Sequence, residues 1–355
     1  MNHENKPVNE DLFRDKLIEL LQAKMRRETP NYMQRDAHPK QHGLVKGTFK
    51  VVADLPVNLQ HGVLVSGRSY DAWVRFSNQN APSQADTKKD IRGAAIKLMN
   101  VPGDKLDVTD GNASSQDFIT ISTPMFITHN VEEFFYLIKA LVKGKLALLW
   151  HFLFHPRSLL NLLKSNKNYR SPLQTRYWST TPYQLGPQQV VKYSLIPHAG
   201  VVTKIPHNAG PDFLRENMVK QLQENDFDFD FCVQLRTEPD LMPVEDPGRR
   251  WPEHISPFVK VATLTIPRQI FDTPAQNAYG ICLSFNPWHS LPAHQPLGGI
   301  NRARRVIYNT LSNFRHQHNS EPQTEPTTYD IPADLLKAGP PPVSADIPEN
   351  PDNQE

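Results

Sequence analysis

Residues 301–315 read Asn-Arg-Ala-Arg-Arg-Val-Ile-Tyr-Asn-Thr-Leu-Ser-Asn-Phe-Arg and contain neither proline nor glycine. Apolar side chains recur about once per helical turn along this stretch, which predicts an α-helix; they are Val306, Ile307, Leu311 and Phe314. On a helix Arg304, Tyr308 and Arg315 share one face, because residues four and seven apart lie one and two turns along. A guanidinium beside a phenol favours the phenolate, which is among the few axial ligands that proteins offer to haem iron. Taken alone, however, the stretch is better explained as an amphipathic helix whose arginines lie in water.

Motifs upstream of this helix change the interpretation, because they follow one another in order at compatible spacings. They are Arg35-Asp36-Ala37-His38, Gly43 with Gly47-Thr48-Phe49, Arg75-Phe76-Ser77, residues 85–93 (Ala-Asp-Thr-Lys-Lys-Asp-Ile-Arg-Gly), Asp117-Phe118-Ile119 and Thr123-Pro124-Met125-Phe126. Together with the helix they resemble the haem-binding core of the catalase family, from about residue 35 to residue 315. Each motif is weak by itself, whereas the ordered series is specific. The resemblance implies an α+β fold, in which an antiparallel β-barrel forms the haem-binding core and helices surround it.

Short runs with alternating or β-branched residues favour a barrel independently of the resemblance. They occupy residues 48–52, 73–77, 94–99, 118–126, 190–196, 226–235 and 258–266, separated by turn-forming residues. Strands so spaced, with few helices between the early ones, are typical of an antiparallel sheet that closes on itself. Helical spacing of apolar residues predicts an N-terminal amphipathic helix over residues 9–25 and another helix over residues 212–224.

The resemblance also implies a cofactor, haem b, and a role for each site residue. Tyr308 would be the iron ligand, with Arg304 supporting its phenolate. His38 would be the distal acid–base group and Ser77 its hydrogen-bond partner; a pKa near neutrality suits an imidazole to take a proton and return it. The remaining cofactor-binding residues would be Arg35, Arg75, Arg315, Phe126 and Phe134. His289 and His294 are alternative iron ligands, but the Arg-x-x-x-Tyr spacing argues against them.

One position departs from the family pattern. Catalases carry an asparagine just before Thr-Pro-x-Phe, where its amide helps to position peroxide. Here either Ile121 or Ser122 occupies that position, depending on the register, and neither side chain has an amide. We therefore expect a more apolar distal pocket, in which fast dismutation of hydrogen peroxide is in doubt.

A second unusual stretch, residues 134–167, mixes apolar residues with lysines. Its apolar part is too short and too interrupted by lysines to span a bilayer. We expect helices that pack on the barrel with their lysines in water; contact with a membrane surface is the alternative. That contact, together with the missing amide, would favour an organic hydroperoxide as the substrate.

Composition sets the remaining expectations. The 355 residues carry a net charge of only +2, which gives no reason to expect nucleic-acid binding, and two cysteines do not form a disulfide framework. The N-terminus lacks the apolar segment of a signal peptide, so a cytoplasmic location is the default. We predict a helical arm (1–29), a haem-binding core (30–318) and a Pro- and Glu-rich extended or disordered tail (319–355). Homo-oligomers are compatible with this organisation.

The function implied by the resemblance is catalase or peroxidase chemistry on hydrogen peroxide or organic and lipid hydroperoxides. Two alternatives stay open. The first is a fatty-acid hydroperoxide isomerase or lyase of the allene oxide synthase type, favoured by the missing amide. The second is a haem-binding protein without turnover, which leaves the pairing of His38 with Tyr308 unexplained.

Overall fold

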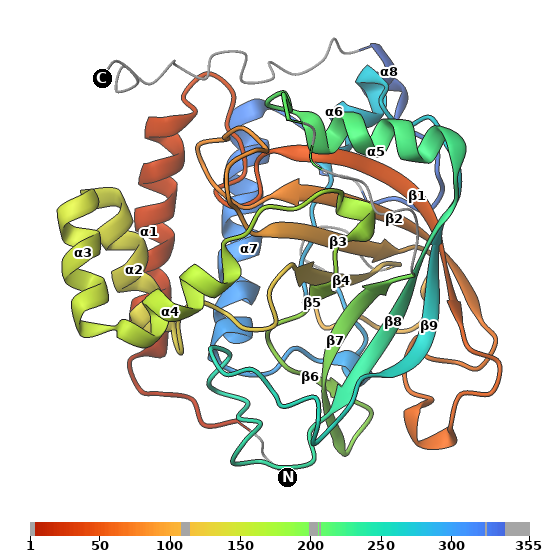
Figure 1. Ribbon diagram of the computed structural model, residues 1–355, viewed down its shortest axis with the longest axis horizontal. Coiled ribbons are helices and arrows are strands. Elements are labelled where there is room, and N and C mark those ends of the chain that lie inside the picture. The colour runs from red at the N-terminus through yellow and green to blue at the C-terminus, as the bar shows by residue number, and fades with distance from the viewer. Residues whose placement is uncertain (1–3, 108–113, 199–204, 206, 324, 338–355) are drawn as a thin grey trace.

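The structure is a computed structural model that describes residues 4–107, 114–198, 205, 207–323 and 325–337. Within these residues, strands form a single antiparallel sheet in the order β5-β4-β3-β2-β1-β9-β8-β7-β6 (Figure 1). A further pairing between β5 and β7 closes all of these strands except β6 into a barrel. The strands are β1 (Gln41–Val51), β2 (Ser69–Asn78), β3 (Arg92–Leu98), β4 (Gln116–Ile121), β5 (Tyr177–Trp178), β6 (Tyr183–Leu185), β7 (Gln189–Pro197), β8 (Phe227–Leu235) and β9 (Val259–Ile266).

Aromatic side chains fill the inside of the barrel. The ring of Phe231 packs 5.0 Å from that of Phe49 and 4.8 Å from that of Phe118, measured between centroids. The barrel is therefore a packed core and not a channel. Because side chains alternate across a strand, the neighbours of these core residues point outward, and the outer face of β2, β3 and β4 is free to form one wall of a site.

Three long helices cover that outer face. They are α1 (Glu10–Glu28), α2 (Val131–Lys143) and α7 (Gly299–Asn319), which lie together beside the barrel in Figure 1. Leu17 and Leu21 of α1 share a buried apolar cluster with Ile300 and Ile307 of α7. This cluster explains why the periodic stretch at residues 301–315 folds as predicted, and it fixes which face of α7 turns toward the protein.

The other helices lie around this core. α3 (Lys145–Phe154) and α4 (Pro156–Ser165) follow α2, and α3 is farthest from the barrel in Figure 1. The remaining helices are α5 (Phe213–Glu224), α6 (Pro274–Cys282) and α8 (Ala333–Lys337), with short 3₁₀ turns at Val57–Leu59, Pro172–Gln174 and Pro292–His294. No helix in the described ranges is long and apolar enough to cross a membrane.

Several elements differ from the sequence-based expectation. Strands β1 and β2 begin at Gln41 and Ser69, earlier than the runs expected at 48–52 and 73–77. The strand expected over residues 118–126 ends at Ile121, because the Ser122 side chain already accepts a hydrogen bond from the Arg92 backbone at 2.8 Å and the chain then turns at Pro124. Helix α6 was not predicted, although Thr273 caps it and Pro274 begins it, which is a recognisable start signal.

Part of the predicted tail packs on the barrel. Tyr329 donates a hydrogen bond to the Gly47 carbonyl at 2.6 Å, and its ring lies 5.4 Å from that of Trp73. The Glu325 carboxylate reaches the buried ammonium of Lys97 at 2.6 Å. Composition did not predict these contacts, because they depend on single residues in an otherwise polar segment. Residues 338–355 of the predicted tail lie outside the described residues.

Candidate active site

One cavity lies between the outer face of β2–β4 and the helices α1, α2 and α7. The sequence-predicted site residues all line it, although they come from segments far apart in the chain; they are Arg35, His38, Arg75, Ser77, Phe126, Phe134, Arg304, Tyr308 and Arg315. The structure thus brings the whole predicted set together. Leu21 and Met25 of the N-terminal helix also line the cavity, so this helix belongs to the site as well.

The His38 imidazole is held against β3 by the backbone and by two neighbours. His38 has a positive φ of 60°, and its amide donates to the Gln79 carbonyl at 3.1 Å. Its Nδ1 lies 3.1 Å from Ser77 Oγ. A Cβ at Gly93 would lie only 2.6 Å from the same Nδ1, so the ring can occupy this place only above a glycine. Gly93 belongs to the Asp-x-Arg-Gly motif, but the sequence did not predict that it leaves the space for the His38 ring.

Strand register decides which residue replaces the asparagine of catalases. Gly93 pairs with Ser77 on one side and with Ile121 on the other, so all three face the same way. Ile121 lines the cavity. Ser122 points elsewhere, because its hydroxyl accepts the hydrogen bond from Arg92. The residue beside His38 is therefore an aliphatic side chain.

The imidazole of His38 is neutral over the ordinary pH range. Burial lowers its pKa to about 3, and the positive charges of Arg75, Arg304 and Arg35 act in the same direction. A neutral ring whose Nδ1 is directed at Ser77 leaves Nε2 to exchange a proton with a ligand.

Arg35, Arg75 and Arg315 form a cationic cluster at the C-terminus of α6. Arg35 donates to the carbonyls of Gly280 and Leu283, Arg75 Nε donates to Gly280 O at 3.2 Å, and Arg315 Nη1 donates to Ile281 O at 2.9 Å. These carbonyls are at the negative end of the helix dipole, which explains how the cluster is tolerated.

Only one carboxylate reaches this cluster within the described part of the chain. Glu321 lies 3.7 Å from Arg315, while neither Arg35 nor Arg75 has an ion-pair partner among the described residues. Burial and the neighbouring Arg315 lower the pKa of Arg75 to about 9. The cluster is thus a place where a ligand with two carboxylates would relieve mutual repulsion.

Tyr308 and Arg304 meet the cavity from α7. Arg304 Nη1 donates to Thr181 Oγ1 and Asn301 Oδ1, both at 3.3 Å, and its guanidinium lies 5.6 Å from the centre of the Phe126 ring. Among the described contacts it makes no hydrogen bond to Tyr308. Arg304 and Tyr308 therefore lie on the same face of α7, as expected, but the expected direct contact between the guanidinium and the phenol is not seen among the described contacts.

A family model described as Catalase matches residues 9–292, most of the chain. The chain belongs to the catalase family. This confirms the resemblance drawn from the ordered motifs, although the match itself names no site residue.

Relatives of this catalase-family chain differ in length. A "Catalase-related peroxidase" of Mycolicibacterium paratuberculosis is 29% identical over 287 residues, which cover 77% of this chain and 86% of that protein. "Catalase A" of Aspergillus fumigatus is 23% identical over 255 residues, 63% of this chain but only 32% of the fungal protein.

Solved catalases share the fold. A fungal catalase superimposes with a TM-score of 0.65 at 18% identity, covering 94% of this chain and 70% of that one. Catalase A from Saccharomyces cerevisiae gives a TM-score of 0.65 at 19% identity, covering 94% and 72%. The predicted α+β catalase-like barrel is confirmed.

The residues of the cavity fit the haem that the catalase family implies. The guanidiniums of Arg35 and Arg75, which have no carboxylate partner in the described part of the chain, suit propionate groups. Tyr308 offers an oxygen ligand, and Phe126 and Phe134 provide aromatic surface from the helical side. The alternative ligands do not reach the cavity. His294 is fully buried between Tyr193 and the Val63 amide, and His289 is bound to Asp117.

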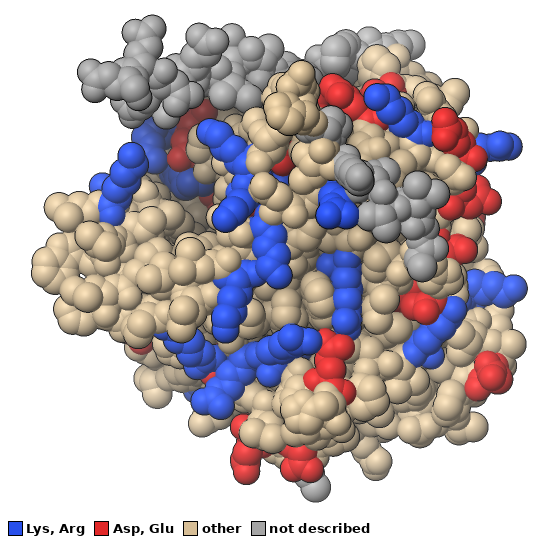
Figure 2. All heavy atoms as spheres, viewed as in Figure 1, with Lys and Arg blue, Asp and Glu red and all other residues tan. Residues whose placement is uncertain are grey.

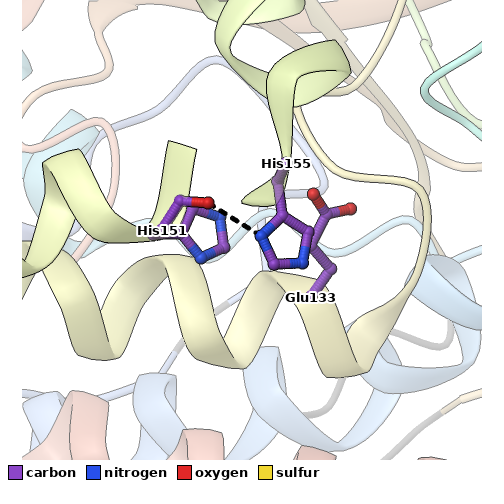
Figure 3. A group of neighbouring side chains, drawn as sticks. All are labelled: Glu133, His151 and His155. Atoms are coloured by element: carbon purple, nitrogen blue, oxygen red, sulfur yellow. Dashed lines mark hydrogen bonds between the residues drawn. The ribbon is translucent and has the colours of Figure 1, made fainter. Parts of the chain in front are cut away.

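A second group of potential ligands lies outside the cavity (Figure 3). One ligand atom each from Glu133, His151 and His155 lie within 4.8 Å of one another. The two imidazoles, however, stack face to face with centroids 4.3 Å apart, and the Glu133 carboxylate already accepts hydrogen bonds from His129 and Ser158. Those bonds lower the pKa of Glu133 to about 2 although its burial alone would raise it. We interpret the group as a junction that holds α2, α3 and α4 together.

Proposed function

We propose that this catalase-family chain is a haem-dependent enzyme that consumes hydroperoxides. The observation that carries the proposal is the composition of one cavity: a neutral imidazole on the sheet wall, a tyrosine on the helical wall, and an arginine cluster in which Arg35 and Arg75 have no ion-pair partner among the described residues. Haem, when bound, would supply the iron that Tyr308 can ligate and the redox chemistry that accompanies cleavage of the O–O bond. The relative named "Catalase-related peroxidase" supports the same conclusion.

His38 moves the proton in this scheme. Its Nε2 accepts the proton of the hydroperoxide from one oxygen and returns it to the other, so that water or an alcohol leaves. Ser77 fixes the ring through Nδ1, and Gly93 lets it approach the sheet. Burial keeps the pKa of His38 near 3, below the near-neutral value expected from the sequence, so the ring is in its neutral, proton-accepting form at any pH above about 4.

Ile121 supports an organic hydroperoxide as the better substrate. An isoleucine offers no hydrogen bond to a small peroxide but provides apolar contact for a carbon chain. The same observation favours the second candidate, a hydroperoxide isomerase or lyase, in which the organic peroxide rearranges without an external reductant. Product identity separates the two: an alcohol with oxidised donor indicates a peroxidase, and a rearranged oxylipin without donor consumption indicates the isomerase or lyase.

The decisive experiment compares the haem-loaded wild type with Tyr308→Phe and His38→Gln. We expect Tyr308→Phe to lose the high-spin ferric absorption of tyrosine-ligated haem. His38→Gln should keep that spectrum while hydroperoxide consumption falls by about two to four orders of magnitude. His254→Gln, on an exposed histidine outside the cavity, is the matched control and should change neither property. Wild-type turnover in His38→Gln would reject the role of His38, and an unchanged spectrum in Tyr308→Phe would reject the ligand.

A further inference from the structure

Helix α3 turns its apolar side to solvent. Five large side chains at positions three or four residues apart form a continuous stripe along the helix, and each is between 57% and 71% exposed. They are Leu146, Leu149, Trp150, Leu153 and Phe154. The opposite side of the helix buries His151 and Phe152. Single exposed leucines are ordinary on a protein surface, but a stripe of this length marks a contact site.

Helix α4 follows α3 along the chain and is polar on the inside. It buries Ser158, Asn161 and Ser165, while Leu160 and Leu163 are 54% and 63% exposed. The buried polar groups are satisfied: Asn161 donates to three carbonyls, including Gly248 O at 3.1 Å, and Ser165 Oγ lies 2.8 Å from Thr123 Oγ1. The helix is therefore held to the protein by hydrogen bonds, while Leu160 and Leu163 project into solvent and Leu159 and Leu162 are half-buried. An ordinary surface helix turns its apolar face to the core and its polar face to solvent, and α4 has the reverse arrangement.

Cationic residues predominate on this surface. No aspartate or glutamate occurs between Glu133 and Asp212, whereas the helices and their flanks carry exposed cationic residues. These are Lys139, Lys143, Lys145, Arg157, Lys164 and Lys167. Arg157 is paired with Asp246 at 2.8 Å, but the ion pairs of the described residues include none of the five lysines. Figure 2 shows the region of α3 as an almost uncharged bulge, and the acidic side chains in that view gather elsewhere.

Lysines and aromatic side chains face each other across a groove between α2 and α3. Lys139, Lys143 and Tyr136 line it from α2, together with Glu132 and Glu133 in the first turn of that helix, and Trp150 and Phe154 line it from α3. Cationic side chains beside aromatic rings on an amphipathic surface are typical of proteins that bind at the boundary between lipid headgroups and acyl chains.

We propose that α3 and α4 form a membrane-docking surface that binds anionic lipid bilayers. The leucines and aromatic rings would enter the interface, and the lysines would contact the headgroups, each adding to the attraction. A second copy of the chain fits less well, because a symmetric contact would bring the same lysines face to face. An acidic protein partner fits less well too, because the apolar stripe lies on a bulge that projects from the protein (Figure 2) and does not line a deep pocket. The proposal is independent of the haem chemistry.

The test uses the full-length protein and vesicles made of equal parts phosphatidylglycerol and phosphatidylcholine, with pure phosphatidylcholine vesicles alongside. In a flotation assay we expect binding to the anionic vesicles, weakened by salt and largely absent with phosphatidylcholine. The triple variant Lys143→Gln/Lys145→Gln/Lys164→Gln should reduce the partition coefficient by about two orders of magnitude. Leu146→Gln/Leu149→Gln/Leu153→Gln should abolish binding. These six side chains are exposed, so neither variant should disturb the fold, and circular dichroism checks this.

Control variants make the outcomes distinct. Lys143→Arg/Lys145→Arg/Lys164→Arg keeps the charge and should bind like the wild type, as should Val57→Gln/Ile270→Gln, which removes exposed apolar residues elsewhere. Trp150→Phe should bind while losing the blue shift of tryptophan emission on vesicle addition. Equal binding to both vesicle types, or failure to bind either, overturns the proposal. Failure to bind combined with a dimer that the leucine variant dissociates in sedimentation velocity would identify the face as a subunit interface instead.

Discussion

At the scale of single residues, the position of the His38 ring depends on the lack of a side chain at Gly93. Gly93 leaves the space that the imidazole occupies, since a Cβ would lie 2.6 Å from its Nδ1. We expect Gly93→Ala to displace the ring and lower hydroperoxide turnover about 100-fold while haem content stays near that of the wild type. Turnover measured against bound haem is the readout. Gly210→Ala, where the nearest atom would be 3.8 Å away, is the control. Full activity in Gly93→Ala would show that the ring is not fixed in this way.

Ile121 gives a second prediction at this scale. Ile121→Asn places an amide beside His38, where it can donate a hydrogen bond worth roughly 1–1.5 kcal/mol to a bound peroxide. We therefore expect oxygen release from hydrogen peroxide to rise about tenfold relative to turnover of an organic hydroperoxide. Ile121→Val, which keeps the pocket apolar, should leave the ratio near the wild-type value. No change in Ile121→Asn would mean that the amide is not what limits dismutation.

Sequence reasoning succeeded with residues that carry chemistry and failed with those that only provide space or backbone groups. The nine predicted site residues line one cavity. All of them except Phe134 belong to motifs with recognisable side chains. Gly93 lies in such a motif, yet its role required the distance to His38. The carbonyls of Gly280, Ile281 and Leu283 that hold the arginines have no side-chain signal at all. Choosing between Ile121 and Ser122 required the strand register.

At the scale of elements, a buried charge cluster fastens the segment after α7 to the barrel. Lys97, fully buried on β3, lies 2.9 Å from Asp117 and 2.6 Å from Glu325. Burial disfavours its ammonium, but the two carboxylates prevail and raise the pKa of Lys97. We expect Lys97→Met to lower the free energy of unfolding by about 3–5 kcal/mol, because two carboxylates lose their counter-charge inside the protein.

Urea denaturation of the single and combined variants tests this. Lys97→Met/Glu325→Gln should recover part of the loss, since one of the stranded charges is gone, and Glu325→Gln alone should cost less than Lys97→Met because Lys97 and Asp117 still form a neutral pair. A double variant that is no more stable than Lys97→Met would argue against the electrostatic explanation. Composition suggested an unattached tail here, because a single glutamate among many gives no sign that it pairs with a lysine over 200 residues away.

For the whole molecule, buried histidines couple stability to pH. His42 and His294 are fully buried, and burial lowers the pKa of each to about 4. Below about pH 6.5 the unfolded chain binds protons that the folded protein excludes, so the free energy of unfolding falls as the pH drops toward 4. Between pH 7 and pH 5 each histidine should remove about 2 kcal/mol.

Chemical denaturation at several pH values measures this slope. The acidic limb should begin below pH 6.5 and extend toward pH 3, because burial also lowers the pKa of His38 and of His316 to about 3. His294→Gln should lower stability at neutral pH but flatten the slope by about one proton. A free energy of unfolding that is unchanged from pH 7 to pH 5 would contradict the burial of neutral histidines. The overall fold was predictable because alternation and helical periodicity of apolar residues recur along the chain. The pH dependence of stability was not, because it depends on which histidines the folded protein buries.

The short strand β5 is the place where the barrel is expected to open transiently. Only Ile121 and Trp178 join β4 to β5, and only two residue pairs join β5 to β7, whereas β1 and β2 are paired along nearly their whole length. This seam has the fewest backbone links around the ring, so transient opening should begin there. In hydrogen–deuterium exchange, the amides around Trp178 should lose protection earlier than those of β1 and β2. Ile121 belongs to this weakly paired junction and also lines the cavity. Opening of the junction would therefore make the β4 side of the cavity flexible, while His38 stays bound to Ser77 on the well-paired strand β2.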